Sequence, residues 1–367
     1  MAITDRKRNR RRSPRIFGIA SRFLLLIAAG LLAMSYLSVL VNPVKAWFLT
    51  IFGLLFVPFF LLNLFLLVWA LVRRSRAFAI PLIALLPSLW FLGGFVRFGG
   101  DETETDDRGI SMMSYNVGRF SPQPRRGIPT RSACLDSVAS YIMSGDMDII
   151  CLQEFYVPYP ETVKQEIERH FHGYEPVYYM YSSEMGMYGN VILSRLPVMG
   201  KGAVEFDESS NLAIYADILT SEGIRRIYNC HLESYSLSFT ALVKSLRRDY
   251  HSAIQETGRK MRASITRRPA QVARVLEGIA MSPVPSMVCG DLNDSPVSYT
   301  YYHLQRGRRD SFRDAGRGMG ASYSILWPLL RIDYIFYPGD MRASEHRTVR
   351  KHWSDHYPVI TRIHFNK

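Results

Sequence analysis

The chain has 367 residues, 48% of them hydrophobic, and a formal net charge of +13 at pH 7. That length is sufficient for one large hydrophobic core or two moderate ones. Residues 1–100 contain 13 of the 45 Lys and Arg residues and a single acid, Asp5, so residues 101–367 hold 32 basic and 31 acidic residues. Residues 101–367 therefore have a net charge of only +1, so the high overall charge is no evidence that this part of the chain binds nucleic acid.

Residues 23–41, 46–72 and 77–96 are three apolar runs without a charged residue. Each reaches the roughly 20 residues that an α-helix needs to cross a bilayer. We therefore expect residues 23–98 to form a membrane anchor with three transmembrane helices. A cleaved signal peptide is the alternative for the first run, but no cleavage site followed by polar sequence is present and two more apolar runs follow.

The basic residues around these runs predict the orientation of the chain. Residues 1–22 are basic, Arg73, Arg74 and Arg76 separate the second and third runs, and the first loop contains only Lys45. The positive-inside rule places such basic segments in the cytoplasm. We expect a multi-pass protein of the cytoplasmic (inner) membrane whose N-terminus is cytoplasmic and whose residues 101–367 are extracytoplasmic. A nucleic-acid-binding arm is the alternative interpretation of the basic N-terminus.

After an acidic linker, residues 99–109, the segment 110–367 reads as one domain. Apolar runs typical of strands occupy residues 110–116, 148–154, 174–181, 191–194, 211–219, 226–231, 287–291, 331–336 and 359–365. Helical spacing occurs in residues 131–143, 161–171 and 269–279. Because Ser221-Glu222-Gly223 joins two strand-like runs as a hairpin would, we expect mixed or antiparallel sheets with outer helices.

Residues 237–281 are basic and partly helical. A solvated helical face explains them most simply, and a contact with substrate or with a membrane surface is the alternative. Cys151, Cys230 and Cys289 each lie inside an apolar run, where free cysteine behaves as a small hydrophobic residue. We expect neither a disulfide nor a zinc site.

The segment 286–296 carries chemically capable side chains at the end of an apolar strand. Gly290 allows a sharp turn, and Asp291, Asn293 and Asp294 follow it. Residues two apart on an extended chain point to the same side, so Asp291 and Asn293 can act together on a metal ion or a phosphate. A turn rich in Asp and Asn is the structural alternative.

Similar polar residues end other predicted strands, lie within one (Asp333) or precede the last one (Asp355 and His356). The full set is Asn116, Glu154, His231, Asp291, Asn293, Asp333, Asp355 and His356. Carboxylates and amides without thiolates suit a hard cation, namely Mg²⁺, Mn²⁺ or Ca²⁺, and the two histidines can exchange protons near neutral pH. The sequence has no Gly-rich phosphate loop and no Gly-x-Ser-x-Gly motif, so it does not support covalent serine catalysis.

Seven short motifs in this order resemble the endonuclease/exonuclease/phosphatase superfamily, the deoxyribonuclease-like fold. They are Ser114-Tyr-Asn116, Leu152-Gln-Glu154, Gly189-Asn-Val-Ile-Leu-Ser-Arg195, Asn229-Cys-His-Leu-Glu233, Gly290-Asp-Leu-Asn-Asp294, Arg331-Ile-Asp-Tyr-Ile335 and Ser354-Asp-His-Tyr-Pro358. The resemblance implies a four-layered α/β sandwich with two facing sheets. It also implies metal-assisted hydrolysis of a phosphoester by an activated water.

The resemblance further implies a role for each residue of the set. Glu154 would be the principal metal ligand, with Asn116 and Asp355 beside the metal or the phosphate. Catalytic roles fall to His356 as the general base held by Asp333, to His231 at the phosphate or leaving group, and to Asp291 and Asn293 as groups that orient the water and a phosphate oxygen. Tyr188 and Asn190 are expected to contact the substrate.

The sequence leaves the substrate open. The inositol-phosphate phosphatases of this superfamily usually carry a Pro-Ala-Trp-Cys-Asp-Arg block, whereas residues 327–333 read Trp-Pro-Leu-Leu-Arg-Ile-Asp. Membrane tethering favours a lipid phosphodiester. A membrane-tethered nuclease acting on DNA or RNA is the first alternative, and a non-catalytic binding module on the same fold is the second. No protein partner is predicted.

Overall fold

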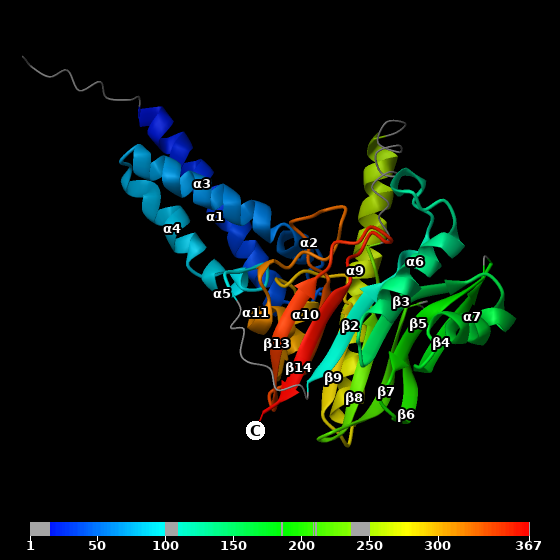
Figure 1. Cartoon of the computed structure of the whole chain (residues 1–367). Coiled ribbons are helices and arrows are strands. Elements are labelled where there is room, and N and C mark those ends of the chain that lie inside the picture. The colour runs from blue at the N-terminus through cyan, green and yellow to red at the C-terminus, as the bar shows by residue number, and fades with distance from the viewer. Residues whose placement is uncertain are drawn as a thin grey trace, which may run out of the picture.

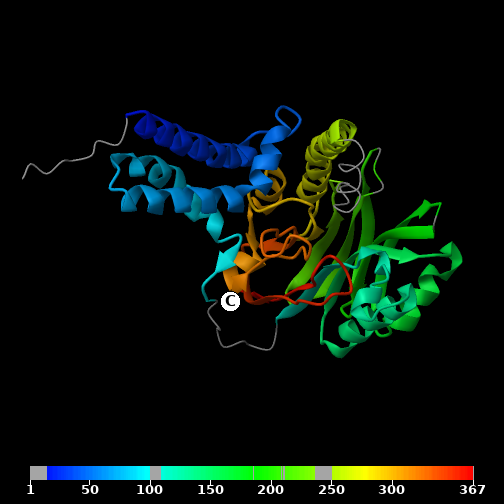
Figure 2. The same cartoon turned by 90° about the horizontal axis from the view of Figure 1, so that it is seen from above.

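The computed structural model describes residues 15–99, 109–184, 186–207, 209, 211–235 and 250–366. A group of N-terminal helices projects from one side of a large β-sandwich (Figures 1 and 2). The N-terminal helices are α1 (Arg15–Leu40), α2 (Phe48–Leu54), α3 (Phe56–Val72), η1 (Arg76–Phe78), α4 (Ala79–Leu85) and α5 (Ser88–Leu92).

The expectation of three membrane-spanning helices is wrong in detail. Within the described residues, one helix, Gly18–Leu40, is long and apolar enough to cross a membrane, and α2 and α3 would add a second only if this pair, bent by 64°, counted as one span. The third apolar run is divided into α4 and α5, with Pro87 at the break. Proline lacks the amide hydrogen that a continuous helix requires, which explains why this run does not form one long helix.

Two six-stranded sheets form the sandwich, as expected. The first has the order β13-β14-β2-β3-β5-β4 and the second β10-β12-β9-β8-β7-β6. Strands of the first sheet are β2 (Ile110–Asn116), β3 (Ile149–Val157), β4 (Glu175–Ser183), β5 (Gly186–Ser194), β13 (Met341–Thr348) and β14 (Val359–Phe365). Strands of the second are β6 (Val198–Glu205), β7 (Leu212–Thr220), β8 (Gly223–His231), β9 (Ser286–Asp291), β10 (Arg308–Asp310) and β12 (Asp333–Pro338).

Only β2–β3 and β8–β9 pair in parallel within these two sheets, so both sheets are mixed. The predicted hairpin is confirmed, because Thr220 pairs with Gly223 across the β7–β8 turn. Strands β6 and β13 were not predicted. Their residues are mostly half-buried and include charged side chains, so they lack the apolar run that marks the inner strands.

Three cores separate four layers. Inward-facing residues such as Met112 and Ile214 fill the space between the sheets. Met113 and Tyr115, which alternate with Met112 along β2, pack on the other face with α6 (Arg131–Ser144) and α7 (Val163–His170). Helices α9 (Tyr250–Ala280) and α10 (Tyr299–Gln305) cover the second sheet. Figure 2 shows the teal and green helices α6 and α7 on one side of the sandwich and the yellow helix α9 on the other. The four cysteines are buried and free.

The N-terminal helices contact the sandwich through defined polar groups. The Ser38 hydroxyl donates to the carbonyl of Val297 at 2.8 Å, and Ser295 donates to the carbonyl of Gly53 at 3.1 Å. Two short strands, β1 (Val96–Arg97) and β11 (Gly318–Met319), pair beyond α5, and helix α11 (Ser311–Ala315) lies near this junction. The segment 294–298, which follows strand β9, is thus bound directly by α1 and α2.

Candidate active site

Polar side chains of both sheets meet at one edge of the sandwich. Strands β2, β8 and β9 end there with Asn116, His231 and Asp291. His231 pairs in register with Asp291, and Asp291 with Asp333, the first residue of β12. The parallel pairing of β8 with β9 brings their carboxyl ends to the same edge, and the antiparallel β12 begins where they end.

Glu154 reaches this edge by a different route. The expectation that its strand ends at Glu154 is wrong, because β3 continues to Val157. The register with β5 shifts between Leu152 and Phe155, and Glu154 has φ of 52°. This irregularity has the character of a β-bulge, which re-aims a side chain within a strand. A positive φ is costly for a residue with a Cβ, and such strain is concentrated at functional sites.

Asn116 links the two sheets at the centre of the site. Its Nδ2 donates to Glu154 Oε1 at 3.2 Å and to Asp291 Oδ2 at 3.0 Å. Its Oδ1 accepts the backbone amide of Gly118 at 3.0 Å. The side chain is buried, and these bonds fix both the amide orientation and the separation of the two carboxylates.

Both histidines lie close to Oδ2 of Asp291. His356 Nδ1 is 3.0 Å and 3.2 Å from the two oxygens of Asp333, which leaves Nε2 facing Asp291 Oδ2 at 3.6 Å. His231 Nε2 is 3.7 Å from Glu154 Oε1 and 3.9 Å from Asp291 Oδ2. That nitrogen is buried without a hydrogen-bond partner among the described residues, so it is available to a ligand.

The surroundings shift the pKa values of these groups. Burial disfavours the charged form of His356, but Asp333 and Asp291 outweigh it and hold its pKa well above the usual range. Burial raises the pKa of Asp291 to about 6, although His356 opposes this shift. Burial alone would raise the pKa of Glu154, but His231 and the hydrogen bond from Asn116 lower it by more. The net effect is a pKa below the usual value for Glu154, so the carboxylate stays ionised.

The loop after β9 contains both site and structural residues. Asn293 has φ of 51°. Its backbone N–H donates to Asp291 Oδ1 at 2.8 Å, and its side-chain Nδ2 donates to the carbonyl of Leu232 at 2.9 Å. Asp294 is buried and forms an ion pair with Arg268 at 2.8 Å. The solvated face expected for the basic segment is therefore wrong for Arg268, which is buried against Asp294 and the carbonyl of Asn293.

Three further predicted residues are placed less centrally. Asp355 is half-buried beside His356 and accepts a hydrogen bond from the Ser354 hydroxyl at 3.2 Å. Tyr188 reaches the site through Arg119, whose guanidinium lies 5.0 Å from the ring centre. Asn190 is fully buried, and its Nδ2 donates at 3.1 Å to the carbonyls of Leu212 and Asn229, so it joins the two sheets.

Two residues near the site were not predicted. Arg119 Nε is 3.4 Å from Glu154 Oε2. The Tyr323 ring packs edge-on against the His356 ring with centroids 5.2 Å apart. Arg119 follows the Ser-Tyr-Asn motif by three residues, which is a usable signal, whereas Tyr323 lies in a loop whose position depends on the fold.

The donor set fits a divalent cation. Ligand atoms of Asp291, Asp333 and His356 lie within 4.8 Å of one another, and all three residues are buried. Glu154 adds an ionised carboxylate at the same edge, and His231 adds a nitrogen without a partner. Carboxylate oxygens with a few nitrogens suit Mg²⁺ or Mn²⁺.

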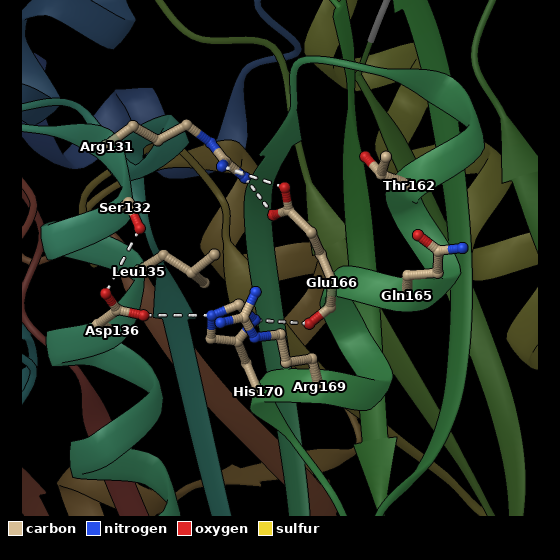
Figure 3. A pocket seen from close by; sticks show the side chains of 9 residues that line it. All are labelled: Arg131, Ser132, Leu135, Asp136, Thr162, Gln165, Glu166, Arg169 and His170. Atoms are coloured by element: carbon tan, nitrogen blue, oxygen red, sulfur yellow. Dashed lines mark hydrogen bonds and ion pairs between the residues drawn. The ribbon is translucent and has the colours of Figure 1, made fainter.

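A cavity of about 360 Å³ lies between α6 and α7, and no residue of this catalytic set lines it. Figure 3 shows Arg131 paired with Glu166 and Asp136 in contact with His170, and Arg169 also lines the cavity. The candidate catalytic residues therefore lie at the sheet edge and not in this cavity.

Comparison with known proteins agrees with this geometry. The family model described as "Endonuclease/Exonuclease/phosphatase family" matches residues 113–356. A second model, described as a domain of unknown function, matches residues 15–95. A search of curated proteins found no match.

Several solved structures share the fold. An endonuclease/exonuclease/phosphatase from Beutenbergia cavernae DSM 12333 has a TM-score of 0.52 and 17% identity over 71% of this chain and 72% of its own. A family protein from Bacteroides thetaiotaomicron has a TM-score of 0.51 and 15% identity over 71% and 98%. The human Nocturnin catalytic domain with bound sulfate anion has a TM-score of 0.51 and 16% identity over 74% and 100%. The family model spans well over half of the chain, and the chain therefore belongs to the endonuclease/exonuclease/phosphatase family, whose members are hydrolases that act on phosphoester bonds.

Proposed function

We propose that this protein is a membrane-anchored, extracytoplasmic phosphoesterase that hydrolyses a phosphodiester with an activated water and a divalent metal. The observation that carries the proposal is the convergence of Asn116, Glu154, His231, Asp291 and the His356–Asp333 pair at one sheet edge. A lipid head group is the favoured phosphoester, because the chain has an apolar N-terminal helix that could tether it to a bilayer.

Glu154 and Asn116 are proposed to hold the metal, with Asp355 nearby, whereas Asp291, Asp333 and His356, whose ligand atoms could also reach a cation, are assigned to the water and the phosphate. When bound, Mg²⁺ or Mn²⁺ would supply Lewis-acid stabilisation of the charge that develops on the phosphate oxygens. The lowered pKa of Glu154 favours this role, because an ionised carboxylate is the required ligand. Asn116 fixes Glu154 Oε1 and would thus orient the carboxylate toward the cation.

The remaining side chains are assigned to water and phosphate. Asp333 orients the His356 ring through Nδ1, so Nε2 is the atom that would accept the proton of the attacking water. Asp291 and Asn293 would align that water on the phosphorus. His231 Nε2 has no hydrogen-bond partner among the described residues and is proposed to donate to a phosphate oxygen.

The test is hydrolysis of a soluble diester, bis(p-nitrophenyl) phosphate, by the purified full-length protein with Mg²⁺ or Mn²⁺. We expect EDTA to abolish turnover and added metal to restore it. Glu154→Ala and His356→Ala should each lower kcat by at least about a hundredfold, the scale of losing a metal ligand or a general base. Glu222→Ala, at the opposite end of β8, is the matched control and should keep wild-type activity.

Full activity in both site variants would refute the proposed roles. A parallel panel of DNA, RNA, a phospholipid diester and a phosphomonoester distinguishes the lipid phosphodiesterase from the tethered nuclease. The orientation is tested separately with reporter fusions at residue 105. Activity from a fused enzyme that works only outside the cytoplasm would support the proposed topology. Activity from a fused enzyme that works only inside the cytoplasm would contradict it.

A further inference from the structure

The loop between β11 and β12 exposes five consecutive residues without a polar side chain. Ile325, Leu326, Trp327 and Leu329 are 54%, 47%, 37% and 37% exposed, and Pro328 between them is also exposed. We call residues 325–329 the apolar loop. A run of this kind on a folded surface is unfavourable in water and marks a site that contacts a membrane or another protein.

Residues on both sides of the apolar loop form hydrogen bonds with the chain just after helix α5. The amide of Gly320 donates to the carbonyl of Phe95 at 2.9 Å, and Arg331 Nη1 donates to the carbonyl of Gly94 at 3.2 Å. Strand β11, just before the segment, pairs with β1, just after α5. The apolar loop therefore emerges from the place where the apolar helices join the sandwich.

The same segment touches the candidate active site. The amide of Ser324 donates to the backbone carbonyl of Asp355 at 2.7 Å. Tyr323 forms a β-bridge with His356 and packs edge-on against its ring. The exposed apolar residues thus begin two positions after a residue in contact with the histidine proposed as the general base.

The charge around the apolar loop favours a lipid surface over a second protein. The Arg350 guanidinium lies 4.2 Å from the centre of the Trp327 ring, and Lys351 beside it is exposed. Tryptophan and basic side chains are enriched at the boundary between head groups and hydrocarbon, where the ring lies at the interface and the cation meets anionic lipids. Helix α1, which is long and apolar enough to cross a membrane, would hold the chain at the bilayer to which such a loop would bind.

From these contacts we infer that the apolar loop inserts into the interface of the bilayer that holds the N-terminal helices, so that the active site takes a lipid phosphoester directly from that bilayer. This inference rests on the proposed function for the identity of the reaction. The loop would serve to hold the sheet edge against the head groups, while the catalytic groups remain those of the sandwich.

The insertion is tested without turnover. Leu326→Cys in the full-length protein is labelled with an environment-sensitive fluorophore, which is selective because the four native cysteines are buried. The protein is reconstituted in vesicles of phosphatidylcholine and phosphatidylglycerol. We expect quenching by lipid-attached nitroxide and protection from aqueous iodide. Ser221→Cys in the β7–β8 turn, at the other end of the sheets, is the control and should be quenched by iodide only.

Activity supplies the second measurement. The triple variant Ile325→Ser, Leu326→Ser, Trp327→Ser should keep wild-type kcat/KM on the soluble diester. On a phospholipid in vesicles it should lose at least about tenfold, since several large apolar side chains no longer enter the bilayer. Met281→Ser, a single exposed apolar residue beyond α9, should change neither rate.

The outcomes separate the two proposals. A fluorophore at residue 326 that is quenched by iodide, or one shielded from both quenchers by a second protein, overturns the inference even if the enzyme is active. Equal losses on soluble and vesicle substrates also overturn it. If no phosphoester is hydrolysed but the fluorophore is in lipid, the proposed function fails and the membrane insertion of the loop stands.

Discussion

His356 depends on Asp333 for both its orientation and its charge. The carboxylate contacts Nδ1 through both oxygens and contributes to a pKa well above that of a free histidine. Asp333→Asn keeps the shape but removes the anion, so it should lower the pKa of His356 and allow the wrong tautomer. We expect kcat to fall on the order of a hundredfold with little change in KM.

The measurement is the pH profile of kcat, which should shift to lower pH in the variant. A merely structural role for Asp333 would lower the amount of folded enzyme without moving that profile. Asp340→Asn, a half-exposed carboxylate in an ion pair with Arg225, is the control for charge removal elsewhere.

His346 in β13 predicts an acid-dependent loss of stability. Burial and the nearby Arg331 lower its pKa to about 3, although Asp310 opposes this shift. A free histidine titrates near 6.5, so at roughly pH 3 to 6.5 the unfolded chain binds a proton that the folded chain does not. Stability from this group is therefore complete above that range and is lost as pH falls through it.

We expect His346→Gln to lose less stability on acidification than the wild type, by up to about 1.4 kcal/mol per pH unit. Thermal unfolding midpoints of both proteins in detergent, measured from about pH 7 to 4, test this expectation. The exposed His352→Gln is the control. Parallel curves for wild type and His346→Gln would contradict the prediction.

At the scale of elements, helix α2 contacts the loop that follows the catalytic motif. A Cβ on Gly53 would collide with the carbonyl of Val297 and the hydroxyl of Ser38. Gly53→Ala should therefore push α2 away from residues 294–298 and destabilise the protein by about 1–3 kcal/mol, the usual cost of overpacking. Because these residues adjoin Asn293, activity should fall as well.

Unfolding midpoint and kcat of Gly53→Ala test this contact. The matched control is Gly30→Ala in α1, where a Cβ would have no neighbour within 4 Å. If both variants behave alike, the contact between α2 and the loop is not important for the site.

For the whole molecule, the N-terminal helices and the sandwich share one apolar cluster. Val297 of the sandwich is fully buried among Leu32, Val39 and Phe56. Removal of residues 1–100 would expose this cluster and take the carbonyl of Gly94 from Arg331. We expect residues 101–367 to fold but with a lower unfolding midpoint, at about 2–4 °C for each 1 kcal/mol lost.

Calorimetry of the truncated and full-length proteins in the same detergent measures this difference. An equal midpoint would show that the helices only tether the sandwich. A lower midpoint together with a lower kcat on the soluble diester would show that they also hold residues 294–298 in place.

Much of the inner fold could be predicted from the sequence. Strands β2, β3, β8, β9 and β14 are buried on both faces or nearly so, and they therefore appear as apolar runs. Strands β6 and β13 could not be predicted in this way, because their half-buried residues follow no simple apolar pattern. The lengths of the apolar runs also predicted too many membrane-spanning helices, because the third run is divided at a proline.

The sequence by itself determined which residues are candidates for the site, because Asn116, His231 and Asp291 end apolar strands and polar groups at strand ends meet at a sheet edge. The tertiary structure alone decided how these residues are arranged. The bulge at Glu154, the buried Arg268–Asp294 pair and the contact of Tyr323 with His356 all join segments far apart in the chain. Such contacts depend on the register and packing of whole sheets, which no local pattern encodes.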